Sequence, residues 1–282
     1  MKTSRHILLA LALALTVLAA ACGGDGGDDQ EPTGDGEATS ADGGDAPADL
    51  GLQQEGLLVV GSDIAFEPFE FIQDGEPAGF DIDLMNEIAS RLGVEVEYVN
   101  ASFDTIFTQL ASGDFDAIIS AITITEERQQ TIAFTDPYFA ANQALAVSEG
   151  SDIASVDDLA GKQLAAQANT TGLDYANENF TDATIVEFPT SEAAFTALRS
   201  GQVDAVFIDL PVVGQQEASS EGEVVLAEEV DTGELYGIGV QQDNEGLVAA
   251  INEQLAAIIE DGTYEQFYSE WFEGDVPEQF RQ

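Results

Sequence analysis

Short apolar runs alternate with amphipathic stretches along the chain from residue 57 onward. Residues 57–61 form an apolar run, which predicts a buried strand. Residues 81–92 place apolar side chains at helical spacing and are followed by Gly93, so we predict a helix that ends there. Residues 94–98 alternate between apolar and acidic side chains, which predicts a second strand.

The same order continues to the end of the chain. We predict further helices at 103–111, 173–180, 192–199 and 247–259, and further strands at 116–121, 162–167, 184–188 and 203–208. The aromatic-rich tail at 262–272 is expected to pack into the core. Strands that alternate with helices favour parallel sheets built from β-α-β units.

Two segments of the chain repeat one another. Residues 110–117 and 198–205 match at a leucine, a serine, a glycine, an aspartate and an alanine in the same positions. Each segment covers the end of a predicted helix, a glycine stop and the start of a buried strand. We therefore predict two related α/β lobes.

The N-terminal part of the chain has a different pattern. Lys2 and Arg5 precede an apolar run at 7–18 and three alanines at 19–21, which is the order of a signal peptide. Residues 22–55 are rich in Gly and Asp and hold few large apolar side chains, so we expect a disordered acidic tether. The pattern predicts an exported protein whose folded part begins after the tether.

Cys22 is the only cysteine, so no internal disulfide can form. The segment 18–22 resembles a bacterial lipoprotein box, with its leucine one position further from the cysteine than usual. This resemblance implies that Cys22 is acylated and anchors the protein to the outer face of the cell membrane. Cleavage after Ala21 that leaves a free thiol is the alternative.

The composition is strongly acidic, with 54 Asp and Glu against seven Lys and Arg and a formal net charge of −47. Such a charge repels phosphate and argues against nucleic acid as a partner. It either adapts the surface to high salt, which screens the self-repulsion, or draws cationic solutes toward the protein. The spread of acidic residues along the whole chain favours salt adaptation.

Residues typical of catalysis are scarce. The one histidine, His6, lies in the predicted signal peptide, which argues against histidine bases, histidine triads and the usual zinc sites. The sequence holds no glycine-rich nucleotide motif, and Lys2 and Lys162 are its only lysines. This composition favours a binding protein without a metal or cofactor over an enzyme.

Polar residues follow three predicted strands, at 62–66, at 120–128 and at Asp209. Ligands of open α/β sheets bind beyond the carboxyl ends of the strands. A cleft between two lobes would gather all three segments, so we predict the ligand site there.

Several motifs resemble the family 3 extracellular solute-binding proteins, which serve polar-amino-acid ABC transporters. The motifs lie at 61–71, 79–84, 121–128, 134–138, 170–172, 203–209, 262–264 and 271–272. The resemblance spans about 57–272 and implies a periplasmic-binding-protein-like type II fold, with two α/β lobes joined by a two-segment hinge. The crossings are expected near 138–142 and 232–236, with lobe 1 at 56–139 plus 236–282 and lobe 2 at 140–235.

The resemblance also implies roles for single residues around a bound amino acid. Arg128 would bind the α-carboxylate through two charge-assisted hydrogen bonds, unless it is a surface helix residue. Asp209 would bind the α-ammonium with Thr123 and the carbonyl of Ala121, unless it only turns the chain before Pro211. Family members often carry glycine at the position of Ala121.

Five further residues are expected at the same end or along the walls of the site. Thr170 and Thr171 would offer backbone N–H groups at the start of a helix, and a helix cap is the alternative. Phe66 and Phe103 would form apolar walls, although aromatic residues are more often core. Ser120 belongs to the strand end that leads to Thr123.

Asp63 would lie at the far end of the ligand side chain. Its carboxylate would accept from a guanidinium, ammonium or amide and would repel an acidic side chain. Gln167 takes a position that is basic in some relatives, which further weakens any preference for acidic ligands. We expect Arg, Lys, ornithine or His first, then Gln, with Glu and Asp last.

We therefore expect the substrate-binding component of an amino-acid ABC importer. It would be a monomer that closes its lobes on the ligand and presents it to a permease and ATPase complex. One alternative is an enzyme that resembles cyclohexadienyl-type dehydratases, with Asp63 or Asp209 as general acid. A sensory or structural lipoprotein is the other alternative.

Overall fold

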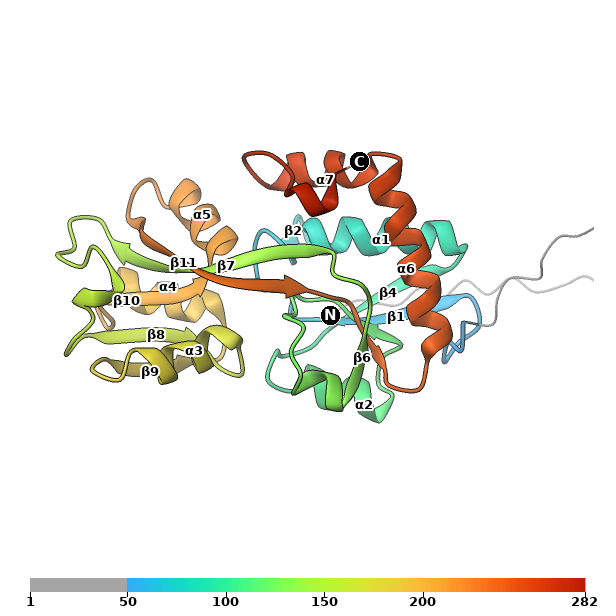
Figure 1. The fold of residues 1–282 in the computed structure, drawn as a ribbon, viewed down its shortest axis with the longest axis horizontal. Coiled ribbons are helices and arrows are strands. Elements are labelled where there is room, and N and C mark those ends of the chain that lie inside the picture. The colour runs from blue at the N-terminus through green and yellow to red at the C-terminus, as the bar shows by residue number, and fades with distance from the viewer. Residues whose placement is uncertain (1–49, 282) are drawn as a thin grey trace, which may run out of the picture. The chain divides into compact units, whose positions relative to one another are not determined.

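The computed structural model describes residues 50–281. The predicted signal peptide, the lipidation site Cys22 and most of the predicted tether lie outside the described residues. The described part contains two five-stranded sheets and a two-stranded hairpin (Figure 1). We define lobe 1 as the first sheet with its helices and lobe 2 as the second sheet with its helices.

Lobe 1 is built on a mixed sheet of strand order β4-β1-β5-β12-β6. Its strands are β1 Leu57–Ser62, β4 Glu95–Asn100, β5 Ala117–Ile118, β6 Ile132–Phe134 and β12 Gly239–Gln241. Its helices are α1 Phe80–Leu92, α2 Ile106–Ser112, α6 Glu245–Glu260 and α7 Thr263–Trp271. The hairpin pairs β2 Phe71–Gln73 with β3 Glu76–Ala78. β1 is parallel to both β4 and β5, as the β-α-β order predicts.

Lobe 2 repeats this plan with strand order β11-β7-β10-β8-β9. Its strands are β7 Phe139–Ser148, β8 Gln163–Gln167, β9 Thr184–Phe188, β10 Ala205–Asp209 and β11 Val224–Tyr236. Its helices are α3 Thr171–Asn179, α4 Ser191–Arg199 and α5 Leu210–Ser219. β8 is parallel to β9 and β10, and β7 is antiparallel to β10 and β11.

The sequence repeat corresponds to a structural repeat. α2 and α4 are each followed by a glycine in the left-handed region, with φ 84° at Gly113 and 70° at Gly201. Asp116 then accepts from an N–H of β1 at 2.9 Å, and Asp204 accepts from an N–H of β8 at 2.7 Å. In each lobe the aspartate therefore aligns the next strand with its parallel neighbour. The prediction of two related α/β lobes is confirmed.

Two predicted elements were wrong in their extent. The strand predicted at 116–121 pairs only over Ala117–Ile118, because the chain leaves the sheet and reaches φ 47° at Ala121. The helix predicted at 103–111 begins at Ile106, because the N–H of Thr105 closes a turn on the carbonyl of Ser102 at 3.0 Å.

Residues before β1 are already attached to lobe 1. Leu50 and Leu52 pack against its hydrophobic core. The N–H of Gln53 donates to Asp116 at 2.9 Å, and the side chain of Asn244 donates to the carbonyl of Leu50 at 3.0 Å. The tether predicted to end at residue 55 therefore includes residues that are packed, because the two leucines supply apolar surface that lobe 1 can bury.

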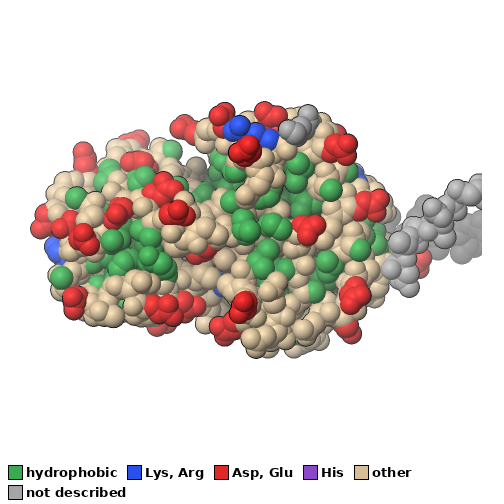
Figure 2. Space-filling view, in the orientation of Figure 1, with side chains coloured by type: hydrophobic (Ala, Val, Ile, Leu, Met, Phe, Trp, Pro, Cys, Tyr) green, Lys and Arg blue, Asp and Glu red, His purple; other side chains and the backbone are tan. Residues whose placement is uncertain are grey.

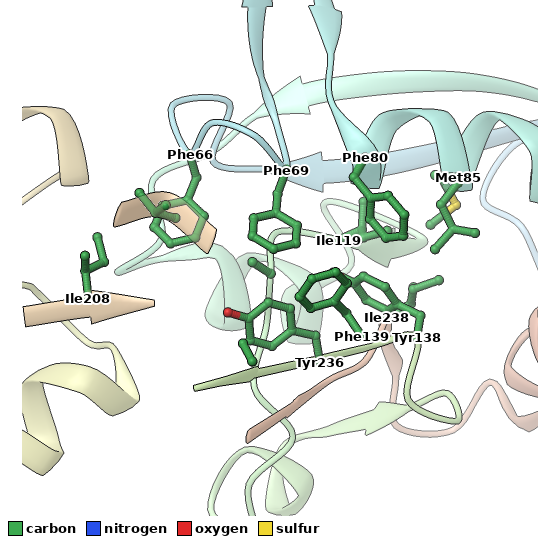
Figure 3. Packing of buried hydrophobic residues seen from close by; sticks show 14 of the residues in the cluster. Phe66, Phe69, Phe80, Met85, Ile119, Tyr138, Phe139, Ile208, Tyr236 and Ile238 are labelled. Atoms are coloured by element: carbon green, nitrogen blue, oxygen red, sulfur yellow. The ribbon is translucent and has the colours of Figure 1, made fainter. Parts of the chain in front are cut away.

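The chain passes between the lobes at two neighbouring places, where β7 begins and β11 ends. Phe139 packs against Phe69 and Tyr236, with ring centroids 5.0 and 5.6 Å apart (Figure 3). The hydroxyl of the fully buried Tyr264, in α7, donates to the carbonyl of Tyr138 at 2.7 Å. Both crossing segments are thus anchored in aromatic core of lobe 1, and the predicted core packing of the aromatic tail is confirmed.

The acidic side chains are scattered over the face shown in Figure 2 and do not gather in one patch. The described residues include five Lys and Arg, and four of them form ion pairs with carboxylates. These four are Arg91, Lys162, Arg199 and Arg281. Within the described part, the fifth cation, Arg128, forms no ion pair with a carboxylate.

Candidate functional site

A small cavity lies between the two lobes. It is lined by Asp63, Phe66, Phe103, Ser120, Ala121, Thr123, Arg128, Gln167, Thr170, Thr171 and Asp209. These are the eleven residues that the sequence predicts at the ligand site, and their role in binding stays a prediction. The free volume for water-sized molecules is only about 20 Å³, which is enough for about one water molecule. A molecule as large as an amino acid can therefore enter only when the lobes separate.

Strand ends bring these residues together. In lobe 1, the lining residues follow the carboxyl ends of β1, β4 and β5. In lobe 2, Gln167 ends β8, Asp209 ends β10, and Thr170 and Thr171 begin α3. The lining thus follows the rule for open α/β sheets, with both lobes facing one cavity.

Side-chain contacts close the cleft from both sides. They include Gln167 to Asp63 at 3.2 Å, Thr123 to Glu234 at 2.8 Å, Arg128 to the carbonyl of Asn169 at 3.1 Å, Ser191 to the carbonyl of Ala65 at 3.1 Å, and Gln215 to Glu67 at 2.7 Å. Most of them join residues that line the cavity or lie beside it. The contacts stabilise the closed arrangement of the lobes.

Arg128 is positioned by carbonyl groups and aromatic rings. Its guanidinium donates to the carbonyls of Thr123 at 2.8 Å and Asn169 at 3.1 Å. It lies 4.8 Å from the ring centroid of Phe107 and 5.5 Å from that of Phe103, within the range of cation–π attraction. Burial lowers the pKa of the Arg128 guanidinium, and nearby carboxylates oppose this effect. The side chain is therefore a fixed cation with no carboxylate partner among the described residues.

Asp209 is a buried carboxylate at the same end of the cavity. It accepts from the side-chain amide of Gln143 at 2.8 Å. Burial, and then the negative charge of Glu234, raise the pKa of Asp209 to about 7. A group with this pKa gains strongly from a cation placed beside it, because the cation stabilises the ionised form.

Asp63 of lobe 1 and Gln167 of lobe 2 meet in the cavity lining. Asp63 is 7% exposed, and burial raises its pKa to about 6. Gln167 donates to Asp63 at 3.2 Å, while its own oxygen Oε1 is buried without a hydrogen-bond partner in the described residues. This pair therefore offers acceptors and suits a ligand group that carries donors.

Two buried acids support the wall at 120–121. Ser120 donates to Glu70 at 2.7 Å and accepts from the N–H of Asp63 at 3.1 Å. The N–H of Ala121 donates to Asp81 at 2.8 Å. Burial raises the pKa of Asp81 to about 6, and burial together with the charge of Asp81 raises the pKa of Glu70 well above its usual range. The wall at 120–121 is therefore held by hydrogen bonds to two buried carboxyl groups.

Thr170 acts as a helix cap. Its hydroxyl accepts from the N–H of Leu173 at 3.1 Å and donates to the carbonyl of Gln167 at 2.8 Å. The capping alternative raised by the sequence is therefore present. The residue also lines the cavity, at a helix start whose first N–H groups have no partner within the helix.

The family model described as bacterial extracellular solute-binding proteins, family 3, matches residues 58–274. The chain belongs to this family. The matched segment runs from β1 to beyond α7 and includes every cavity-lining residue.

Individual relatives agree with this assignment. The ABC transporter glutamine-binding protein GlnH of Bacillus subtilis (strain 168) is 33% identical over 275 residues, which cover 96% of this chain and 98% of that protein. The arginine-, lysine-, histidine-binding protein ArtJ of Geobacillus stearothermophilus is 35% identical, with a TM-score of 0.75 over 80% of this chain and 99% of that one. The ancestral amino acid-binding protein AncCDT-1, a precursor of cyclohexadienyl dehydratase, is 35% identical, with a TM-score of 0.74 over 77% of this chain and 96% of that one. The predicted family and fold class are confirmed.

Two polar residues behind the lining could not be predicted from the sequence. Gln143 donates to Asp209 and to Glu234, and Glu234 accepts from the hydroxyls of Thr123 and Thr171. Glu234 lies in a segment rich in acidic residues, so nothing in the pattern distinguished it. For Glu70 a signal existed, because an acid between Phe69 and Phe71 in an apolar stretch indicates burial.

Proposed function

We propose that this protein is the substrate-binding component of an amino-acid ABC importer and captures a polar or basic L-amino acid between its lobes. One observation carries the proposal: Arg128 is the only Lys or Arg among residues 50–281 that does not pair with a carboxylate, although acids greatly outnumber cations. Arg128 lines the cavity, where the carboxylate of a ligand would supply the missing anionic partner.

The other polar groups support the same orientation of the ligand. Asp209 would bind the α-ammonium beside Arg128, and Asp63 with the unpartnered oxygen of Gln167 would bind a donor on the side chain. Arginine, lysine, ornithine or histidine fits this arrangement best, followed by glutamine. The similarity to glutamine-binding GlnH and to arginine-, lysine-, histidine-binding ArtJ supports this range.

Delivery would depend on hinge closure between lobe 1, at 56–139 plus 236–282, and lobe 2, at 140–235. Ligand would bind the closed arrangement more tightly than the open one, and the permease would recognise the closed form. The protein would work outside the cytoplasmic membrane, held there by an acylated Cys22. The helices between residues 50 and 281 all lack the length or the apolar character of a membrane span.

A dehydratase activity is the competing function, because Asp63 and Asp209 have pKa values suited to a general acid. The similarity of this chain to a precursor of cyclohexadienyl dehydratase also favours testing for this activity. The protein would be incubated with a cyclohexadienyl acid whose ring hydroxyl and ring carboxylate can leave as water and CO2. We expect this acid to stay unchanged, and formation of the aromatic product would establish the enzyme instead. A purely sensory role would leave uptake intact in cells that lack the protein.

Arg128→Ala tests the proposal most simply. Loss of a buried charged partner costs about 2–5 kcal/mol, so we expect affinity for L-arginine to fall by about 30-fold or more in calorimetric titration. Arg199→Ala is the matched control, because Arg199 pairs with Glu192 on the surface of α4. The control should bind like the unmodified protein. Equal affinity in both variants would contradict the assigned role of Arg128.

A further inference from the structure

Glu234 lies on β11 where the chain returns to lobe 1, behind the cavity lining. The pairing of β11 with β7 shifts register between Val230 and Glu234, and three residues bulge out there. Gly233 takes φ 60° in this bulge, and its N–H donates to the side chain of Asn142 at 3.2 Å. Bulges redirect the side chains that follow them. The half-buried carboxylate of Glu234 accordingly reaches the threonines of both lobes.

One oxygen of Glu234 joins the two lobes. Its Oε2 accepts from the hydroxyl of Thr123, in lobe 1, at 2.8 Å and from the hydroxyl of Thr171, in lobe 2, at 2.9 Å. The amide of Gln143 lies 3.3 Å from its Oε1 and donates to Asp209 at 2.8 Å. Glu234 is therefore connected to three groups around the expected position of the α-ammonium.

These contacts decide what the threonines can offer to a ligand. A hydroxyl has one proton to donate and two lone pairs that accept. When the proton points to Glu234, only the lone pairs remain for the cavity. Both hydroxyls then act as acceptors, which suits an ammonium group and leaves a ligand without donors at that position poorly bound.

We infer that Glu234 is a specificity-determining residue of the proposed amino-acid site: by holding the protons of Thr123 and Thr171 it makes the cavity select for a ligand α-ammonium. The inference rests on the proposed function. Glu234 would act through the two threonines as a positioning residue and through its charge on Asp209.

The charge of Glu234 gives the inference a second readout. It is one cause of the raised pKa of Asp209, after burial. Other titratable or charged groups around the two acids are Arg128, Glu127 beside it, Asp174 in α3, Tyr236 in β11 and Asp81 behind Tyr236. An ammonium binds best when Asp209 is ionised, so affinity should fall as pH drops through about 7. Without the charge of Glu234, this midpoint should move to lower pH.

The test uses calorimetry on the purified full chain with Glu234→Gln and a matched control. The control is Glu229→Gln, an equal charge change at an exposed position of the same strand, where the amide oxygen can still accept the hydrogen bond that Asn142 donates at 2.7 Å. The probes are L-arginine, L-glutamine and 5-guanidinopentanoate, which is arginine without its α-amino group, at high salt and from pH 5.5 to 8. Thermal melts of the unliganded variants establish that each is folded.

We expect Glu234→Gln to bind L-arginine about 10- to 100-fold more weakly, because the neutral amide holds the threonine protons less strongly than the carboxylate and removes the negative charge near the ammonium. Its preference for L-arginine over 5-guanidinopentanoate should narrow, and its pH midpoint should move down. Thr171→Val should lower the affinity similarly, with no further loss when the two changes are combined. Glu229→Gln should match the unmodified protein in every respect.

Three results would overturn the inference. These are an affinity of Glu234→Gln within about twofold of the unmodified protein, a weaker affinity with unchanged discrimination and pH midpoint, and equal effects of Glu229→Gln. If the unmodified protein binds neither L-arginine nor L-glutamine, the proposed function itself fails and the inference fails with it. The two failures are thus told apart by the unmodified protein.

Discussion

Individual residues of the cavity are held in states that they would not adopt in a free chain. Ala121 has φ 47°, a left-handed conformation that glycine adopts more readily and that costs alanine about 1–2 kcal/mol. The N–H of Ala121 is fixed on Asp81, which explains how this backbone is held. Asp63, Asp81 and Asp209 are kept partly protonated near neutral pH by burial. The site therefore contains a strained backbone at Ala121 and buried carboxyl groups whose ionised forms a bound cation would stabilise.

These raised carboxyl pKa values predict how stability depends on pH. A carboxyl whose pKa is higher in the folded than in the unfolded state binds extra protons when folded, so it contributes stability at low pH. That stability is lost as pH rises through the folded pKa, here about 6 for Asp63 and Asp81 and about 7 for Asp209. We expect the unliganded protein to melt about 5 °C higher at pH 5.5 than at pH 8.

The melts would be recorded at high salt, which screens the repulsion between surface acids that acts in the same direction. Asp209→Asn is the control, because it removes the group with the highest of these three pKa values and should flatten the profile near pH 7. A melting temperature that rises from pH 5.5 to pH 8 would contradict the assigned protonation states.

The cavity residues could be predicted because they lie in motifs of the family, whereas Glu234 and Gln143 behind them could not. Arg128 and Asp209 follow strands that the apolar pattern predicts. Glu234 depends on a bulge of β11, and the alternation of side chains gives no sign of which way an acid beyond a bulge will point. Gln143 lies on a strand for which no prediction was made. Long-range contacts of this kind follow from tertiary packing and not from local pattern.

Single elements must approach closely for the site to form. α3 meets β7 at Gly172, where a Cβ atom would lie 2.6 Å from the side-chain oxygen of Gln143. Gln143 in turn donates to Asp209 and contacts Glu234. The small residue at the start of α3 thus allows the helix to lie against the strand that supports the ammonium end.

Gly172→Ala should therefore weaken binding although alanine favours helices. The added methyl group must displace Gln143 and disturb Asp209, so we expect affinity for L-arginine to fall about tenfold in calorimetry. Gly214→Ala in α5 is the matched control, because nothing lies within 4 Å of its added Cβ atom. It should stabilise the protein by up to about 1 kcal/mol and leave affinity unchanged. Equal affinities of the two variants would show that the approach of α3 is not tight.

Most elements were predictable from periodicity, and their ends were not. β9 agrees with its prediction residue for residue, because Thr184–Phe188 is a clear strand between turns. β5 is shorter than its apolar run, because the run continues into the cavity wall at Ser120 and Ala121. Apolar character therefore signals burial in this segment without distinguishing a strand from a buried loop. In the segment before β1, Leu50 and Leu52 pack against the core although the surrounding residues are polar, so two apolar side chains are enough to attach this segment to lobe 1.

At the scale of the whole molecule, two lobes of similar plan meet around the small cavity that the predicted site residues line. The connections are anchored in the aromatic core of lobe 1, while β7 and β11 continue into the sheet of lobe 2 (Figures 1 and 3). Hydrogen bonds across the cleft involve the side chains of Thr123, Arg128, Gln167, Ser191 and Gln215. A ligand that joins Arg128 and Asp63 of lobe 1 to Asp209 of lobe 2 would add ionic contacts between the lobes. These contacts exist only in the closed arrangement, so their free energy would favour closure.

The most direct test is calorimetric titration of the purified protein at high salt with the twenty common L-amino acids and ornithine, combined with small-angle scattering before and after saturation. We predict binding of a small set, with arginine, lysine, ornithine or histidine first, glutamine next and glutamate and aspartate absent, together with a more compact protein on saturation. Absence of heat with every amino acid, or tight binding of glutamate or aspartate, would contradict the proposed site.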